Sequence, residues 1–314
     1  MDICLMDARN TVYRHGWTRQ NLRNTEKKPT GAIFGFLSCL VRLRNFYPNA
    51  KFIMCWDGKD PGNSWRHQYS SSYKAHRKST TGEELPIEVR NILSQIPAVK
   101  QVSEILGIPQ FEVDSLEADD LIGILSKIFS DKKEVDNVYI YSMDKDMYQL
   151  IGGKVSVIRD LDKAKKCKPY KAKDVLKDHG VAPIDWIKYR ALVGDPSDGI
   201  KSAFKKVGKV TALKILAAGL DPSKKEPTKP IEKKYSKEWS RCHKNYILSK
   251  IVIDANSKRL LEKNKVQLAE LLKNIDFIPV VQDREDAAKQ FIRFCSKYQL
   301  NWVMEQRFKF FKML

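Results

Sequence analysis

The sequence has few cysteines and lacks any long run of apolar residues. No stretch approaches the roughly 20 apolar residues that a membrane-spanning helix needs. Residues 1–7 form a short apolar run that ends in an aspartate, which is not the pattern of a signal sequence. The six cysteines are scattered, with no Cys-x-x-Cys pair and no histidine at zinc-binding spacing. We therefore expect no membrane association, disulfide or zinc site, and a cytoplasmic protein with reduced thiols.

Positive charge is in excess. The chain has 57 Lys and Arg against 38 Asp and Glu, a formal net charge of +19 and a sequence pI near 9.5. This balance is typical of proteins that bind polyphosphates such as nucleic acids. With 314 residues and 42% hydrophobic content, the chain can form one α/β domain with a smaller helical region.

Strand-like and helix-like segments alternate in the first half of the chain. Four apolar runs predict strands, at residues 3–6, 52–56, 138–142 and 155–158. The first three are nearly continuous in apolar residues, which indicates burial on both faces. Residues 31–46 and 116–129 carry apolar residues at helical spacing. This alternation predicts a mostly parallel, doubly wound sheet flanked by helices.

Nine carboxylates occur in five short clusters: Asp7; Asp57; Glu117, Asp119 and Asp120; Asp144 and Asp146; Asp195 and Asp198. Asp7, Asp57 and Asp144 directly follow predicted strands, and ligands of parallel sheets collect at the carboxyl ends of the strands. Carboxylates a few ångströms apart repel one another, and divalent ions such as Mg²⁺ or Mn²⁺ relieve this repulsion. The pattern predicts a metal-dependent nuclease.

Each cluster also has a purely structural interpretation. Ser115 could cap a helix whose first turn carries acids. Asp144 and Asp146 could lie in a solvated turn, and the composition of Gly-Asp195-Pro-Ser-Asp198-Gly is that of a turn. Taken one by one, the clusters leave both interpretations open.

Taken in order, the clusters resemble the 5′ nuclease family, which includes flap endonucleases, the 5′ to 3′ exonuclease domain of bacterial DNA polymerase I and stand-alone bacteriophage enzymes. The resemblance covers about residues 2–218. It is carried by Leu-Met-Asp7-Ala-Arg-Asn with Tyr13-Arg14; Cys-Trp-Asp57 with Arg66-His67 and Tyr73-Lys74-Ala-His-Arg77; Leu-Glu117-Ala-Asp119-Asp120-Leu-Ile; Ser-Met-Asp144-Lys-Asp146-Met-Tyr-Gln-Leu; Asp185-Trp with Tyr189-Arg190-Ala-Leu-Val-Gly-Asp195-Pro-Ser-Asp198; and Val207-Gly208-Lys-Val-Thr211-Ala212.

The resemblance implies a PIN-like fold and two-metal catalysis. It assigns a first metal site to Asp7, Asp57, Glu117, Asp119 and Asp120, and a second to Asp144, Asp146, Asp195 and Asp198. Asp7, Asp57 and Asp146 are expected to act directly in catalysis. Lys74 and Arg77 would clamp the scissile phosphate, and their spacing of three predicts one face of a helix. Arg14 is expected to contact a phosphate and Tyr73 to stack on a terminal base.

The resemblance also implies two DNA-binding elements. A helical arch is expected at about residues 74–97, inside a nuclease core of residues 1–194. Residues 195–314 would form a helical duplex-binding region and carboxyl-terminal helices. A helix-three-turn-helix element would contact the duplex through Lys205, Lys206, Gly208, Lys209 and Thr211. The family's Gly-x-Gly turn is here Lys206-Val-Gly208, and its Asp-Asn is Asp198-Gly199, which leaves a monovalent cation such as K⁺ an open prediction.

The last third of the chain resembles no family segment. Residues 221–234 have the composition of a linker, and residues 239–253 and 287–302 have amphipathic helical patterns. A terminal aromatic cluster, Phe308, Phe310 and Phe311, is expected to pack onto the core. The alternative is a docking peptide for a replication protein.

The preferred hypothesis is a structure-specific 5′ nuclease, acting as a monomer on flapped or branched duplex DNA and on RNA–DNA hybrid in replication and repair. Replication proteins are its expected partners, and the chain is too short to carry a polymerase as well. Two alternatives stay open: an RNA-directed PIN-like nuclease, and a non-catalytic nucleic-acid scaffold whose acids are remnants.

Overall fold

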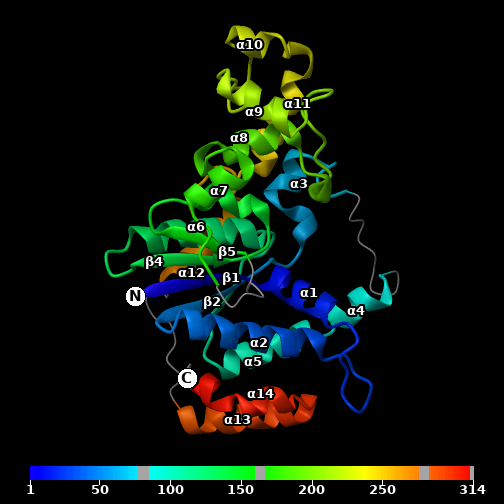
Figure 1. Cartoon of the computed structure of the whole chain (residues 1–314), viewed down its shortest axis with the longest axis vertical. Coiled ribbons are helices and arrows are strands. Elements are labelled where there is room, and N and C mark those ends of the chain that lie inside the picture. The colour runs from blue at the N-terminus through cyan, green and yellow to red at the C-terminus, as the bar shows by residue number, and fades with distance from the viewer. Residues whose placement is uncertain (76–84, 160–166, 274, 276–282, 312–314) are drawn as a thin grey trace.

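The structure, a computed structural model, describes residues 1–75, 85–159, 167–273, 275 and 283–311. The molecule is elongated, with the sheet in the middle (Figure 1). A helical tip lies at one end and comprises α9 (Lys209–Ala217), α10 (Pro230–Lys233) and α11 (Trp239–Ser249). The helices α13 (Arg284–Tyr298) and α14 (Asn301–Glu305) lie at the other end. Among the described residues, no helix is both long and apolar enough to cross a membrane.

Five parallel strands form the sheet in the order β3-β2-β1-β4-β5. Their bounds are β1 (Asp2–Asp7), β2 (Ala50–Trp56), β3 (Gln110–Glu112), β4 (Asn137–Tyr141) and β5 (Val155–Ile158). The four strands predicted from the sequence are confirmed to within two residues at each end. The short edge strand β3 was not predicted, because its three residues carry no apolar run. The doubly wound, mostly parallel sheet is confirmed.

Successive residues of the central strand face two separate apolar cores. Ile3 and Leu5 of β1 point into one core and Cys4 and Met6 into the other, as the two-residue period of a strand requires. The first core contains residues of α6 (Ala118–Asp131), and the second contains residues of α2 (Gly31–Phe46). Burial on both faces explains why the central strands are apolar throughout.

The helices follow the predicted patterns closely. The predicted helix at residues 31–46 is α2, and the one at 116–129 is α6, which begins two residues later than predicted. The remaining helices that surround the sheet and the site are α1 (Ala8–Thr18), α3 (Trp65–Tyr69), α4 (Ile87–Leu93), α5 (Ile96–Ile105), α7 (Ala172–His179), α8 (Pro183–Val193), α12 (Glu262–Lys273) and α15 (Arg307–Phe311), with short 3₁₀ turns η1 (Pro61–Asn63), η2 (Lys145–Leu150), η3 (Pro196–Asp198) and η4 (Ser236–Glu238).

The carboxyl-terminal helices pack onto the core, as predicted. Phe291, Phe294 and Phe310 belong to the same apolar core as α2, and the rings of Phe291 and Phe310 lie 4.8 Å apart. The side chains of Phe308 and Phe311 lie outside the described residues. Packing of Phe310 favours a structural role for this cluster over a docking peptide.

The prediction of a linker at residues 221–234 is wrong. The carboxylate of Glu232, which is fully buried, accepts hydrogen bonds from the backbone N–H groups of Asp221, Thr228 and Lys229 at 2.7–3.1 Å. These bonds close the segment into a compact loop, because a buried carboxylate requires donors around it. Composition alone carries no information about such a closure.

Candidate metal and phosphate site

Three of the predicted acids lie at the carboxyl edge of the sheet, as expected. Asp7 ends β1 and caps α1, with Oδ1 accepting from the N–H of Asn10 at 3.1 Å and Oδ2 from Ser142 Oγ at 2.9 Å. Asp57 follows β2, and its Oδ1 accepts from the N–H of Ala118 at 3.1 Å. Asp144 follows β4 and caps η2. Neighbouring parallel strands therefore bring these segments together.

The start of α6 supplies the next acids. Glu117 is the residue that precedes the first turn of α6, and Asp119 lies within that turn. Ser115 does not cap this helix: its backbone is in the left-handed region, with φ 56°, and its hydroxyl accepts from Lys263 Nζ at 2.9 Å. The acids at this helix end are thus presented to the site by the strand-to-helix turn.

Asp120 has a different environment from its neighbours. It is 0% exposed, and Arg66 donates to both of its oxygens, from Nη1 at 2.6 Å and from Nη2 at 2.9 Å. Trp65 Nε1 donates to Oδ2 at 2.7 Å and the N–H of Val252 to Oδ1 at 2.9 Å. Each oxygen thus accepts two hydrogen bonds, which is its usual capacity. This geometry favours a role for Asp120 in holding Arg66 in place over the predicted role as a metal ligand.

Asp146, Asp195 and Asp198 form a carboxylate triad. Each offers an oxygen, and these oxygens all lie within 4.8 Å of one another. The loop after α8 brings the last two residues in: Gly194 has φ 78°, and a Cβ there would lie 2.5 Å from the carbonyl oxygen of Ile200. A glycine is therefore needed at this turn. The predicted turn is present, and it is also part of the acidic site.

Two buried cations balance the acids. Arg66 Nη1 donates to Glu117 Oε2 at 3.1 Å in addition to its bonds with Asp120. Arg190 donates from Nε to Asp146 Oδ1 at 2.8 Å and from Nη2 to Asp195 Oδ2. Sequence reasoning assigned no role to either arginine. Both arginines lie within sequence segments that carry the family resemblance, but the sequence does not show which acids they bind.

Lys74 lies between the two acidic groups. Its Nζ donates to Glu117 Oε1 at 2.9 Å and lies 3.9 Å from Asp198 Oδ1. Its backbone is left-handed, with φ 50°, and α3 ends before it at Tyr69. The prediction that Lys74 lies on a helix is therefore wrong. Arg77 lies outside the described residues, so the predicted pairing of Lys74 with Arg77 stays a prediction.

The predicted stacking role of Tyr73 is also wrong. Tyr73 is only 3% exposed, and its ring packs with Ile200 and Leu248. Its hydroxyl lies 3.1 Å from Glu117 Oε2 and 3.2 Å from Asp198 Oδ2 and donates between them. A buried ring offers no face to a nucleobase, whereas the hydroxyl can align two carboxylates.

Burial and mutual repulsion perturb the acids strongly. Burial, and then the Asp57 carboxylate, raise the pKa of Asp7 from 3.8 to about 7. Burial also raises the pKa of Asp146 to about 7, against the opposing effect of Arg190 and with a further contribution from Asp144, Asp195 and Asp198. For Asp119, burial and then Asp144 and Asp7 raise the pKa well above 3.8. Such groups are stabilised in the charged form by a nearby cation.

Glu117 behaves in the opposite way. Burial would raise its pKa, but Arg66 and Lys74 outweigh burial and lower the pKa of Glu117 from 4.5 to about 2. Glu117 is therefore ionised at any ordinary pH. The site thus combines acids that the protein's own cations compensate, such as Glu117 and Asp120, with others, such as Asp7 and Asp119, whose pKa values stay raised.

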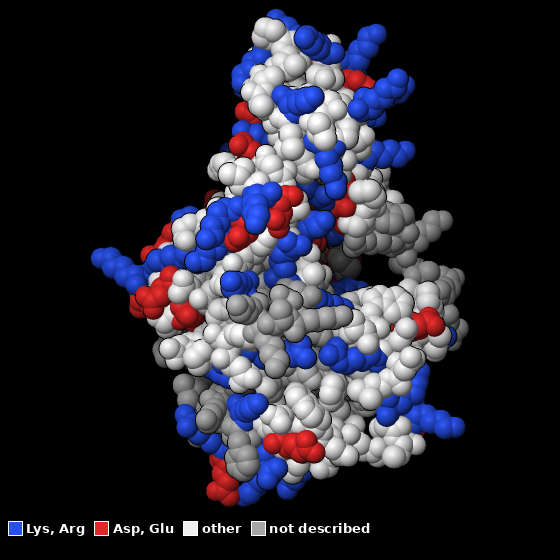
Figure 2. Space-filling model, in the orientation of Figure 1, with Lys and Arg blue, Asp and Glu red and all other residues white. Residues whose placement is uncertain are grey.

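Apart from Tyr73, Lys74 and Arg77, the residues predicted to bind nucleic acid lie in two places. Arg14, on α1, donates from Nη1 to the carbonyl of Arg159 at 2.8 Å, near the carboxyl edge of β5. The other predicted contacts surround the start of α9: Lys205, Lys206, Gly208 and Lys209 are exposed, and Thr211 is half-buried. Figure 2 shows Lys and Arg side chains over much of the tip formed by α9, α10 and α11. Within the predicted arch, the described part contains α4.

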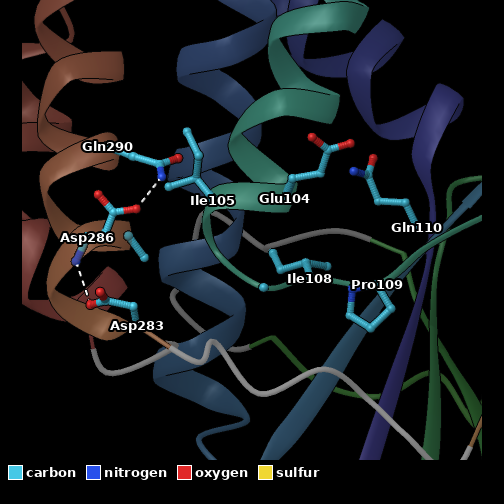
Figure 3. Close-up of a pocket in the computed structure, with 10 residues that line it drawn as sticks. Glu104, Ile105, Ile108, Pro109, Gln110, Asp283, Asp286 and Gln290 are labelled. Atoms are coloured by element: carbon cyan, nitrogen blue, oxygen red, sulfur yellow. Dashed lines mark hydrogen bonds between the residues drawn. The ribbon is translucent and has the colours of Figure 1, made fainter.

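One pocket lies away from the acids. It has a volume of about 530 Å³ and is lined by residues of α5 and α13, among them Glu104, Asp283 and Asp286 (Figure 3). Asp283 accepts from the N–H of Asp286 at 2.9 Å, which is an ordinary helix cap. The pocket contains none of the nine predicted acids, so we do not connect it with their chemistry.

Comparison with known proteins agrees with this geometry. The family model described as the 5′-3′ exonuclease N-terminal resolvase-like domain matches residues 2–180. The chain is 32% identical over 212 residues to a 5′-3′ exonuclease of Aquifex aeolicus, which covers 68% of each protein. It is also 32% identical over 215 residues to the thermostable DNA polymerase I of Thermus thermophilus. That match spans 68% of this chain but only 24% of the polymerase.

Solved structures show the same fold. A crystal structure of the T5 D15 protein with metal ions matches with a TM-score of 0.66 at 20% identity, over 89% of this chain and 100% of that one. The bacteriophage T5 D15 flap endonuclease in a pseudo-enzyme-product complex with DNA and metal ions matches with a TM-score of 0.62 at 18% identity, over 87% of this chain and 100% of that one. Human GEN1 with Holliday junction DNA matches with a TM-score of 0.54 at 14% identity, over 98% of this chain and 71% of that one.

Proposed function

Because the chain belongs to the 5′-3′ exonuclease family, we propose that it is a structure-specific 5′ nuclease that cleaves phosphodiester bonds near the junction of flapped or branched duplex DNA. The observation that carries the proposal is the convergence of acids from five chain segments beside Lys74. Family membership favours this enzyme over a non-catalytic scaffold. RNA–DNA hybrid is a further proposed substrate, as in primer removal.

The donor set fits two divalent ions. Carboxylate oxygens are the ligands that Mg²⁺ prefers, and the triad oxygens lie within 4.8 Å of one another. We assign one ion to Asp7, Asp57, Glu117 and Asp119, and the other to Asp144, Asp146, Asp195 and Asp198. Mg²⁺ is the proposed ion and Mn²⁺ a substitute. When bound, such ions supply an activated water and offset the negative charge of a phosphodiester.

The chain's own residues orient and bind the substrate. Lys74 is placed to bind a phosphate oxygen, since its ammonium already lies among the acids. Tyr73 aligns Glu117 with Asp198 through one hydroxyl. Arg77 is proposed as the second half of the phosphate clamp. Asp7, Asp57 and Asp146 are proposed to act closest to the reacting phosphate.

Duplex binding is assigned to the tip. Lys205, Lys206 and Lys209 are exposed beside the start of α9, where backbone N–H groups also favour phosphates. A monovalent cation such as K⁺ at the nearby turn is part of the proposal. We propose that the enzyme acts in the cytoplasm of a bacterial or phage-infected cell, as a monomer beside replication proteins.

The test is cleavage of a 5′-labelled flap duplex in Mg²⁺, Mn²⁺ or EDTA. We expect metal-dependent cleavage near the junction by the intact chain and loss of cleavage, with binding retained, in an Asp146→Ala, Asp198→Ala double variant. Asp131→Ala, an exposed site on α6, is the matched control and should cleave normally. Tight, salt-sensitive binding without cleavage in any metal would favour the scaffold instead, and cleavage confined to RNA would favour the RNA-directed nuclease.

A further inference from the structure

Arg190 occupies a central position in the carboxylate triad. It lies in the last turn of α8 and reaches Asp146, from η2, and Asp195, from the following loop. Its side chain is only 14% exposed. Two of its nitrogens donate to two different members of the triad, so one guanidinium joins carboxylates that are 49 residues apart in sequence (195 − 146).

Asp195 has little acceptor capacity left. Its Oδ1 accepts from Ser197 twice, from the N–H at 2.9 Å and from Oγ at 2.6 Å. Two donors fill an oxygen of this kind. The other oxygen, Oδ2, accepts from Arg190 Nη2. A cation held by this triad must therefore share Asp195 Oδ2 with the guanidinium or take it over.

Sharing is electrostatically costly. A divalent ion bound to oxygens of Asp146 and Asp195 would share those carboxylates with the guanidinium, and the two positive charges would repel each other. Arg190 stays charged, because an arginine guanidinium is not deprotonated in proteins. The guanidinium and a divalent ion thus serve the same function at the same carboxylates.

We propose that Arg190 is the resident counter-ion of the Asp146, Asp195 and Asp198 triad, and that a divalent ion binds there in competition with its guanidinium. Arg190 holds the acids together and lowers the affinity of the triad for the ion. The two ion sites are then unequal, and the triad is the weaker one. This inference rests on the proposed function, because it concerns the second of the two ions.

The test is Mn²⁺ binding to the intact chain and to Arg190→Gln, measured by electron paramagnetic resonance of free Mn²⁺. The Mn²⁺-binding step that is lost in the Asp198→Asn variant is the one that belongs to the triad. We expect Arg190→Gln to tighten that step by roughly tenfold or more and to change the other step little, because one competing charge has been removed. Arg44→Gln is the control, since Arg44 is half-buried and donates to the carbonyl of Pro48 far from the acids. An unchanged or weaker triad step in Arg190→Gln would overturn the proposal.

A second measurement uses the unaltered protein, in case the variant does not fold. The Nε–H resonance of Arg190, identified with Arg190→Lys, is followed through a Mg²⁺ titration by nuclear magnetic resonance. We expect it to shift during the weaker binding step, as its bond to Asp146 is lost. A resonance that keeps its position through that step overturns the inference, while a chain that binds no ion at the triad overturns the two-ion function itself.

Discussion

At the scale of single residues, the nine carboxylates divide by the charge that faces them. Glu117 and Asp120 face Arg66; both oxygens of Asp120 are occupied by donors from the protein, whereas, among the described residues, Glu117 Oε1 accepts only from Lys74. Asp7 and Asp146 lie among other carboxylates, and the pKa of each is raised to about 7, although Arg190 opposes the rise at Asp146. Glu117 and Asp120 hold Arg66 within the site. Asp7 and Asp146 are the acids whose pKa a bound cation would lower most.

Replacing Asp120 tests its role as an anchor. Asp120→Asn leaves the buried Arg66 guanidinium without its main partner, so we expect a loss of about 3 kcal/mol in the free energy of unfolding, measured in EDTA by urea denaturation. Asp131→Asn, which removes only an exposed pair with Lys127 on the same helix, should cost less than about 0.5 kcal/mol. If Asp120 were a direct metal ligand, its replacement would weaken Mn²⁺ binding with little effect on stability in EDTA.

The raised pKa values predict how metal binding depends on pH. Below pH 7, Asp7 and Asp146 are largely protonated in the metal-free chain, and an ion must displace these protons. We expect the affinity for Mg²⁺ to rise between about pH 5 and pH 7 and to level off above. Calorimetry in two buffers of different ionisation enthalpy should detect proton release at pH 6. Equal heats in both buffers would contradict the prediction.

The same groups predict the stability of the metal-free chain. Because their folded pKa values lie above the ordinary 3.8, their contribution to stability is complete below about pH 4 and is lost as the pH rises through about 7. A divalent ion should restore part of this loss. Melting temperatures at pH 8 should therefore rise on addition of Mg²⁺ by more than they do at pH 5.

At the scale of elements, the segment after α11 joins the tip to the elements that carry the acids, α6 and η2. Arg66 donates to the carbonyls of Leu248 and Lys250 at 2.9 and 3.0 Å. Gln149 accepts from the N–H of Ile251 at 3.0 Å and donates to the carbonyl of Ser249 at 3.0 Å. Residues 248–252 therefore form part of the wall behind the acids, although they lie beyond the family resemblance seen in the sequence.

Close packing of this segment on α6 can be tested at one glycine. A Cβ on Gly123 would lie 2.4 Å from the carbonyl oxygen of Val252 and 2.5 Å from Ile251 Cγ2. We expect Gly123→Ala to lower the free energy of unfolding by about 1–3 kcal/mol and to reduce cleavage. Gly152→Ala, where a Cβ meets nothing within 4 Å, should change either quantity little. Equal effects of the two variants would show that the segment is not packed tightly.

At the scale of the whole molecule, the net charge is +19, and the tip is among the regions where Lys and Arg side chains are exposed (Figure 2). Each phosphate contact that a lysine makes adds about 0.9 to the slope of log Kd against log salt concentration for duplex binding. We expect the Lys205→Ala, Lys209→Ala double variant to reduce the slope of log Kd against log salt by about 2. A Lys289→Ala, Lys297→Ala variant of α13, at the opposite end of the molecule, is the control. An equal reduction in both would indicate a general charge effect.

Much of the fold is encoded in short stretches of sequence. The apolar runs of β1, β2 and β4 and the helical period of α2 predict those elements within a residue or two, because a strand or helix face is set by the spacing of neighbouring residues. The positions of Asp7, Asp57 and Asp144 at the sheet edge follow from the same patterns. The family resemblance predicts the remaining acids of the site and the proposed nuclease activity.

Only the tertiary structure decides which side chains are free to act. Tyr73 is buried against Ile200, Asp120 is occupied by Arg66 and Val252, and Arg190 joins Asp146 to Asp195. These partners lie far apart in the sequence: Val252 is 132 residues from Asp120, and Tyr73 is 125 residues from Asp198. Burial and hydrogen-bond partners depend on packing between distant segments, and no local pattern records that packing.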